Sequence, residues 1–385
     1  MSKNMWGPGL IAAISGIELT NIVLYMFFGA VYGFYSIIFI SVMFLATIYI
    51  QQTITLLYVS LGKRLSSLIR SLSKDLFSLY RILIYISSNL ILLVNILVLT
   101  YIYYLMFGGS WIPYIIVFIT IMFSLANTYR FKSVEKVLGI LSILLLTYLA
   151  ALVYLVINNE ASTIINLSSI GARYSHYALI AALWGSIASP YSLMIQEDAR
   201  STNDLLPAYI FGVLIGTSIA YYSYLSGINP SDIRMLIYLP LDPALSSKIL
   251  LVGITATVIL ASISILLTSS AITMNTGKVL VSRYKFGLSF TLIFIASIVL
   301  LAPFLRTLPE IEKILVDITI YASDIVGLLF SLSILILSFV FYYLYRSSGD
   351  KLYKLNMLVL SAIAIISLII SFKALIDEII ALFPL

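Results

Sequence analysis

Cysteine is absent from this 385-residue chain, and histidine occurs once, at His176. Without thiols there is neither a disulfide framework nor a thiolate metal site, and a lone imidazole excludes a multi-histidine site. Charged residues are also scarce, at 10% of the chain against about 25% in soluble domains. We find no paired catalytic motif, and therefore expect no enzyme.

Long apolar runs are abundant instead. Hydrophobic residues make up 62% of the chain, and the mean hydropathy is +1.10. About 20 apolar residues are needed to cross a bilayer as a helix. Eleven such spans are predicted, at approximately 8–30, 34–60, 82–107, 112–129, 135–157, 176–196, 206–226, 247–274, 286–305, 316–345 and 354–376. The composition predicts an all-α polytopic membrane protein with a single transmembrane domain over 1–385, since no loop is long enough to fold separately.

Basic residues indicate the orientation in the membrane. With the N-terminus in the cytoplasm, 16 of the 22 Lys and Arg residues fall on the inner side, as the positive-inside rule requires. We therefore expect an integral protein of a prokaryotic cell membrane, with the C-terminus outside. The basic residues are spread between spans, which favours the lipid bilayer over nucleic acid as the partner. The oligomeric state stays open, because lipid-facing and partner-facing surfaces look alike in such sequences.

Two spans are interrupted by polar or helix-breaking residues. Span 1 carries Glu18 within the run Gly-Ile-Glu-Leu-Thr-Asn at 16–21, and a carboxylate inside a bilayer usually marks an ion or substrate path. Span 6 carries Pro190 within Ser-Pro-Tyr-Ser at 189–192. The alternative for Pro190 alone is a simple kink, which membrane helices tolerate.

The two breaks lie five spans apart, as expected for two halves of opposite topology. Repeat one would cover about 8–157 and repeat two about 176–345, followed by an extra helix at about 354–376. Paired broken helices in inverted repeats indicate a binding site near the middle of the membrane, where free carbonyls and helix ends meet the substrate.

The broken segments resemble the Nramp family of divalent-metal transporters. The run at 7–21 is similar to that family's first helix, whose unwound motif is Asp-Pro-Gly-Asn, so that Glu18 takes the Asp place and Asn21 the Asn place. The run at 185–192 is similar to Gly-Ala-Thr-Val-Met-Pro-His-Asn, with Pro190 retained. Two further similar stretches lie at 132–135 and 269–277. The resemblance implies a leucine-transporter-type fold of five plus five helices and transport of a divalent cation by alternating access.

Departures from the family pattern concern the ligands. Ser189 replaces the methionine whose sulfur favours transition metals, and alignment of span 10 places Asp324 where the family has a Gln. Together with Glu18 and Asn21 these residues form the metal site that the resemblance implies. Hard oxygen ligands suit magnesium or manganese, so the resemblance is closest to the magnesium-transporting branch. The cation is the transported substrate, and no resident cofactor is expected.

Weaker candidate ligands surround this set: Ser15, Thr20, Ser186, Tyr191 and Ser192. Each has a structural alternative, because serines pack at helix interfaces and Asn21 could bond the freed backbone of span 1. Tyr191 could fill or gate the cavity rather than bind metal.

Lys132, Glu135 and Gln196 are candidate gate residues at the inner side. Lys132 and Glu135 could equally form an ordinary surface pair. The run Gln196–Arg200 could form an acidic vestibule, although a solvated helix end is the favoured interpretation.

Proton coupling is predicted to be weak or absent. By the same resemblance, the places of the family's proton route are held by Leu92, Asn95 and Gln196, and none of these titrates near neutral pH. Polar residues inside the spans, Gln51, Gln52, Asn95 and Asn127, are expected to form interhelical hydrogen bonds.

The alternative function is sodium- or proton-coupled transport of a small organic substrate, such as an amino acid, on the same fold. In that case Glu18 would bind an amine. Two carboxylates at one site, Glu18 and Asp324, favour a dication instead. A scaffold or sensor derived from the fold is a further alternative.

Overall fold

The computed structural model describes residues 19–107, 174–188, 193, 196–197, 205–226 and 311–382. The elements in these ranges are all helices. They are α2 (Leu19–Tyr32), α3 (Tyr35–Leu61), α4 (Leu65–Leu72), α5 (Lys74–Phe107), α8 (His176–Ile187), α10 (Leu205–Ser226), α13 (Ile311–Ser348) and α14 (Lys351–Leu382). The predicted spans 112–129, 135–157, 247–274 and 286–305 lie outside the described residues. The total of eleven spans and the inverted repeat therefore stay predictions.

Four of the described helices are long and apolar enough to cross a membrane. They are α3, Lys74–Val98 of α5, Lys313–Ser348 of α13 and Lys351–Ile380 of α14. Thr20–Tyr32 and His176–Ile187 are apolar but shorter, as expected if spans 1 and 6 are each made of two half-helices. The chain is an integral membrane protein.

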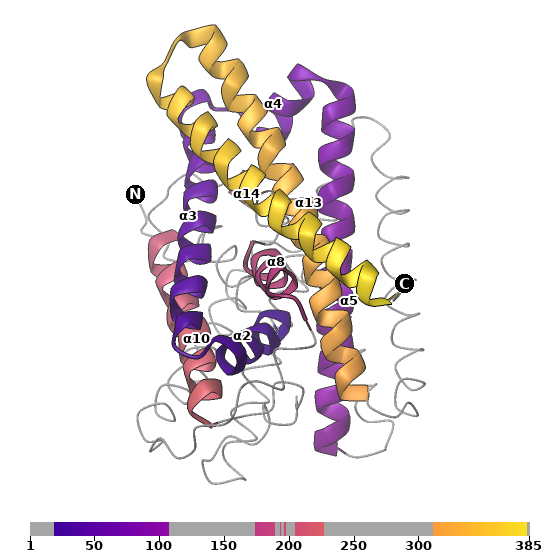
Figure 1. Ribbon diagram of the computed structural model, residues 1–385. Helices are drawn as coiled ribbons and strands as arrows, with labels where there is room; N and C mark the ends of the chain where they lie inside the picture. Colours follow the sequence, from indigo (N-terminus) through magenta and orange to yellow (C-terminus); the bar gives the residue numbers. More distant parts are fainter. Residues whose placement is uncertain are drawn as a thin grey trace.

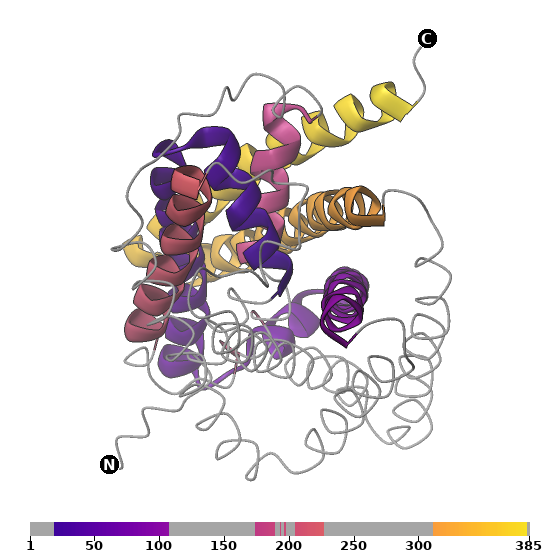
Figure 2. The same ribbon diagram turned by 90° about the horizontal axis from the view of Figure 1, so that it is seen from below.

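Helix α8 lies in the middle of the bundle (Figure 1). It packs between α2 and α14 (Figure 2) and against α13. Helix α10 lies beside α2 and α3. Helices α13 and α14 form an antiparallel hairpin, whose turn carries Gly349 in the left-handed region at φ 70°. This turn and α4 lie at the same end of the molecule (Figure 1), which is the predicted cytoplasmic end.

The 61–81 segment is more ordered than the sequence interpretation had it. We expected a loop between spans 2 and 3, but α4 and the first turns of α5 occupy most of it. Leu65, Leu68 and Ile69 of α4 are buried, while Ser67 and Arg70 stay exposed. This one-sided pattern does not reach the apolar length of a span, yet it suffices for a surface helix.

The last two helices also exceed their predicted limits. The spans at 316–345 and 354–376 lie within α13 and α14, which continue for several residues at both ends. Lys373 and Asp377 of α14 form an (i, i+4) ion pair with 2.7 Å between Nζ and Oδ1. Charged residues of this kind end an apolar window without ending a helix, so the prediction stopped too early.

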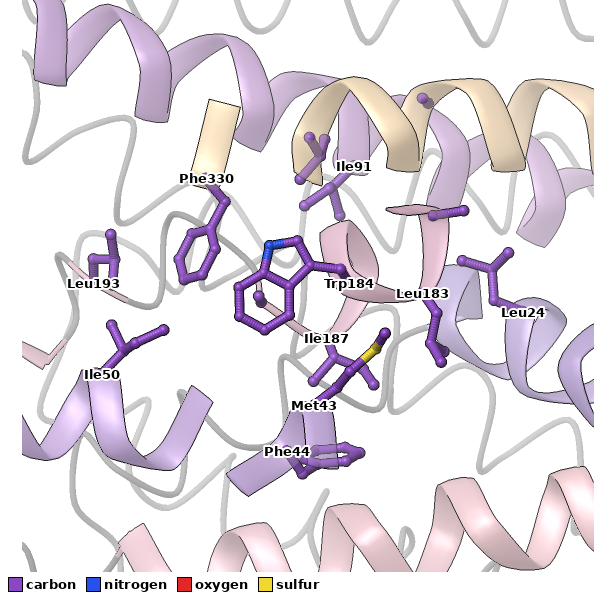
Figure 3. Packing of buried hydrophobic residues seen from close by; sticks show 14 of the residues in the cluster. Leu24, Met43, Phe44, Ile50, Ile91, Leu183, Trp184, Ile187, Leu193 and Phe330 are labelled. Carbon is purple, nitrogen blue, oxygen red and sulfur yellow. The ribbon is translucent and has the colours of Figure 1, made fainter. Parts of the chain in front are cut away.

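The centre of the core is Trp184 of α8 (Figure 3). Its ring lies among Ile50 of α3, Ile91 of α5 and Phe330 of α13. The Phe330 ring meets it edge-on, with 5.6 Å between the ring centroids. The indole Nε1 donates a hydrogen bond of 3.3 Å to Ser331 Oγ. The Trp184 side chain therefore holds α8 to α13.

Candidate functional site

Helix α8 ends where the sequence predicts the break in span 6. Its last residue is Ile187, and Ala188 leaves the helical conformation at φ −94° and ψ 58°. Pro190 follows three residues after Ile187. A proline disfavours the helical conformation of the residue before it and removes a backbone donor, so the helix ends before the proline.

A close helix crossing fixes this end of α8 against α13. A Cβ built at Gly185 would lie 1.9 Å from the carbonyl oxygen of Ser323 and 2.5 Å from the backbone nitrogen of Gly327. Only a residue without a side chain permits this approach. As a result, the end of α8 and the middle of α13, where Asp324 follows Ser323, lie side by side.

The beginning of α2 supplies two further predicted site residues, Thr20 and Asn21, both buried. The Thr20 N–H donates a hydrogen bond of 3.2 Å to Oδ1 of Asn95 on α5. The first N–H groups of a helix have no partner within it, and Asn95 satisfies one of them from a neighbouring helix. The expected interhelical role of Asn95 is thereby confirmed.

Thr20 has a second polar atom at this place. Its hydroxyl oxygen is buried and has no hydrogen-bond partner within the part of the chain that the structure describes. Ser186, near the end of α8, is also buried, and its hydroxyl donates 2.9 Å to the carbonyl oxygen of Leu183. The Ser186 hydroxyl is thus bonded within its own helix, while that of Thr20 lacks a partner among the described residues.

Asp324 lies on α13 with no exposed surface. Glu378 of α14 lies close enough to Asp324 for the two carboxyl groups to influence each other. Neither oxygen of Asp324 accepts a hydrogen bond from a described N–H or O–H group. The predicted span ended at residue 376, so the sequence interpretation missed Glu378. Glu378 follows Ser371 by seven residues and Ser367 by eleven. In a helix this spacing places the three side chains on one face, and this was the signal available in the sequence.

Gln51 departs from its expected role. The side chain is fully buried on α3, and neither its amide nitrogen nor its amide oxygen has a hydrogen-bond partner in the described ranges. The expected interhelical hydrogen bond is thus not found among the described residues, and Asn127 lies outside them.

The inner half of span 6 contacts the α3–α4 corner. Gln196 is fully buried, and its Nε2 donates a hydrogen bond to Thr55 Oγ1 of α3. Glu197 is 3% exposed and accepts hydrogen bonds from Ser66 N at 3.0 Å and from Ser66 Oγ at 2.6 Å. The expected solvated helix end was wrong at this residue, because Glu197 is enclosed against α4.

These contacts cap α4. Arg64, at the N-cap position, makes no side-chain capping bond. The Glu197 carboxylate takes over this role from another part of the chain, where a negative charge also suits the positive end of the helix dipole. Gln196 and Glu197 thus bond to Thr55 of α3 and Ser66 of α4.

The outer ends of α2 and α8 also meet. Tyr32 Oη and His176 Nδ1 lie 2.9 Å apart, and the Phe27 ring meets the Tyr174 ring edge-on. Tyr174 in turn donates a hydrogen bond to Asp317 of α13. Aromatic side chains thus join α2, α8 and α13 at the outer side.

Seven of the predicted site and gate residues lie outside the described residues: Ser15, Glu18, Lys132, Glu135, Ser189, Tyr191 and Ser192. The structure therefore gives no distance between Glu18 and the other candidate ligands. Among the described residues, no group of three or more His, Cys, Asp or Glu side chains is placed to hold a metal. A site here would need the amide, hydroxyl and carbonyl oxygens that the sequence interpretation assigned to it.

The fold resembles that of a known membrane transporter. A structure of the manganese transporter of Eremococcus coleocola, solved with an aromatic bis-isothiourea compound, matches with a TM-score of 0.63 at 14% identity. The match covers 98% of this chain and 91% of the other. Two variants of that transporter, with a histidine or a glutamate replaced by alanine, match with TM-scores of 0.61 and 0.60. Each is 15% identical, over 99% of this chain and 93% of the other.

Comparison by sequence alone finds no relative of this kind. No family model matches the chain, and no curated protein matches it significantly. The likeness therefore lies in the arrangement of helices, and this chain has the fold of a metal-ion transporter.

Proposed function

We propose that this protein transports a divalent metal cation across the membrane by alternating access around spans 1 and 6. The observation that carries the proposal is the close approach of the end of α8, before Pro190, to the part of α13 that holds the buried Asp324. Helix α2, whose buried start carries Thr20 and Asn21, contacts both α8 and α13. The fold shared with the Eremococcus coleocola manganese transporter supports it.

The proposed ligands are oxygen atoms. Glu18, Asn21, Asp324 and Ser189 form the main set, and Ser15, Thr20, Ser186, Tyr191 and Ser192 are secondary candidates. Because the chain has no cysteine and its one histidine lies at the start of α8, the site offers neither thiolate nor imidazole. Carboxylate, amide and hydroxyl oxygens favour magnesium or manganese over softer metals.

Alternating access requires closures on both sides of the site. The outer closure that we propose is the Tyr32–His176 contact between α2 and α8. The inner closure consists of Gln196 on Thr55 and Glu197 on Ser66. Lys132 and Glu135 remain additional candidates for the inner gate. Opening one side while the other stays closed would move the half-helices of spans 1 and 6 against α3, α4 and α13.

Uptake into proteoliposomes tests the proposal. The purified chain should take up Mn²⁺, and Mg²⁺ should compete with it, whereas Glu18→Ala and Asn21→Ala should abolish most of the uptake. Asn356→Ala, which removes an amide bonded to Tyr49 near the inner end of α14, is the matched control and should retain uptake. Undiminished uptake in both site variants would refute the site. Uptake of an amino acid without any metal flux would favour the organic-substrate alternative.

A further inference from the structure

Hydrogen bonds between serines fix the register of the α13–α14 hairpin. Ser338 and Ser361 lie 2.6 Å apart through their hydroxyl oxygens, and Ser331 donates 2.7 Å to Ser367. In an antiparallel pair, about two turns, or seven residues, back along one helix are matched by two turns forward along the other. Seven residues further along each helix, toward the outer side, Asp324 of α13 therefore lies opposite Ala374 of α14.

Two oxygen-bearing side chains of α14 flank Ala374. Ser371 precedes it by three residues and Glu378 follows it by four, so both share its helix face. Glu378 accordingly lies close enough to Asp324 for the two carboxyl groups to act on each other. Around the small side chain of Ala374, the interface presents two carboxyl groups and one hydroxyl.

The oxygens of this cluster lack hydrogen-bond donors. Both oxygens of Asp324, Oγ of Ser371 and Oε1 of Glu378 are buried and have no partner among the residues described. Asp324 and Ser371 have no exposed surface at all. Buried polar atoms are almost always bonded, so four orphan oxygens at one place indicate a ligand from solution. Ser371 gives this indication independently of the acidic pair, because its hydroxyl carries no charge to be explained.

The surroundings offer no compensating positive charge from the described helices. Lys373, the basic residue of α14 nearest in sequence, is half exposed, and its Nζ bonds to Asp377. From α8, the residues packed against Ala374 are Ala178 and Ala181. Two carboxylates in such a place repel each other strongly unless a positive species lies between them.

We propose that Asp324, Ser371 and Glu378 bind a divalent cation between α13 and α14. One dication neutralises both carboxylates, whereas one shared proton would leave a negative charge and the Ser371 oxygen unmatched. The oxygens are hard ligands, and a small hydrated dication completes its shell with water. This inference deepens the proposed function and rests on it in one respect, since Asp324 is a ligand there too. Glu378 and Ser371 extend the cation's path toward the last helix.

Counting bound Mn²⁺ by electron paramagnetic resonance on the purified full-length chain tests this site. We expect Glu378→Gln to lose one bound Mn²⁺ relative to the natural chain. Ser371→Ala should weaken that ion by at least about 10-fold, as loss of a supporting ligand does elsewhere. Asp377→Asn, the neighbouring acid that pairs with Lys373, is the matched control and should bind as the natural chain does.

Three outcomes would overturn the site: equal Mn²⁺ binding in the natural chain, Glu378→Gln and Ser371→Ala; equal loss in Asp377→Asn; or no bound Mn²⁺ that depends on Glu378. If Glu378→Gln fails to fold, Ser371→Ala still decides, since it removes a single oxygen. Failure of the proposed function looks different. In that case Glu18→Ala and Asn21→Ala would leave transport unchanged, while the Glu378-dependent ion would still be bound.

Discussion

At the scale of single residues, neutral side chains perform tasks usually given to charged or capping groups. Asn95 accepts a hydrogen bond from the second residue of α2 across a helix interface. Within its own helix, its Nδ2 donates 3.1 Å to the carbonyl oxygen of Ile91. The amide thus bridges α2 and α5 with both of its polar atoms, which holds the start of α2 where the proposed cation site needs it.

Replacement of Asn95 should therefore lower stability. In Asn95→Leu the Thr20 N–H loses its buried acceptor, and we expect a loss of about 1–3 kcal/mol in the free energy of unfolding. Thermal unfolding in detergent measures it. Asn89→Leu is the control, because the Asn89 amide donates to Tyr85 of the same helix. If both variants melt alike, the bridge to α2 contributes nothing.

At the scale of helices, two devices hold the half-helices of span 6 in place. At the outer half, the absence of a side chain at Gly185 lets α8 touch the backbone of α13. At the inner half, Glu197 supplies the cap that α4 lacks. One device is a steric fit between two helix backbones. The other consists of hydrogen bonds that can break and reform as a gate requires.

Gly185→Ala should push α8 away from α13. The new methyl group would lie 1.9 Å from the Ser323 oxygen, so the helices must separate. Overpacking of this kind costs about 1–3 kcal/mol. Calorimetry should show a lower melting temperature, with the exposed Ser60→Ala as control. An unchanged melting temperature would mean that the crossing is loose.

Glu197→Gln should loosen α4 without unfolding the protein. The variant keeps the shape but loses the negative charge at the helix start, which is worth about 0.3–2 kcal/mol. Hydrogen exchange followed by mass spectrometry should show faster exchange of the α4 amides. Asp75→Asn, an exposed acid in the first turn of α5, is the control. Equal exchange in α4 for the natural chain and Glu197→Gln would exclude the capping role.

At the scale of the whole molecule, described helices from both ends of the chain surround α8. Helices α2, α3 and α5 come from the first 107 residues and α13 and α14 from the last 75, and all five contact each other or α8. The closures that we propose are the Tyr32–His176 contact at the outer side and the Gln196–Thr55 hydrogen bond at the inner side. A mechanism that opens each side in turn must therefore move α8 relative to this frame.

Metal uptake should proceed without matched proton entry. Leu92, Asn95 and Gln196 are buried and do not ionise near neutral pH, so they offer no proton route between them. Proteoliposomes loaded with a pH-sensitive dye should show Mn²⁺ uptake with little acidification. A protonophore control sets the full signal. Acidification that rises in step with Mn²⁺ uptake would contradict this prediction.

Composition and periodicity determined much of this protein. The apolar runs placed α3, α10, α13 and α14, and Pro190 marked the end of α8, because bilayer thickness and backbone chemistry act locally. Residues near helix ends were harder to assign from the sequence. The amphipathic α4 was expected to be a loop, and Glu378 fell beyond the predicted end of its span, since neither feature changes the mean hydropathy enough.

Only the tertiary structure decided the partners. Sequence analysis paired Asp324 with Glu18, which lies outside the described residues, so this pairing stays a prediction. The structure adds Glu378 of α14 as a carboxyl group close to Asp324. Sequence analysis expected the Glu197 side chain to be exposed to water, whereas the structure encloses it at the start of α4. Which buried polar groups meet depends on how helices far apart in the chain cross, and the crossing of α8 with α13 depends on one missing side chain, at Gly185. Local pattern cannot specify such a crossing, because the atoms that must fit together are 138 residues apart in the chain, from Gly185 to Ser323.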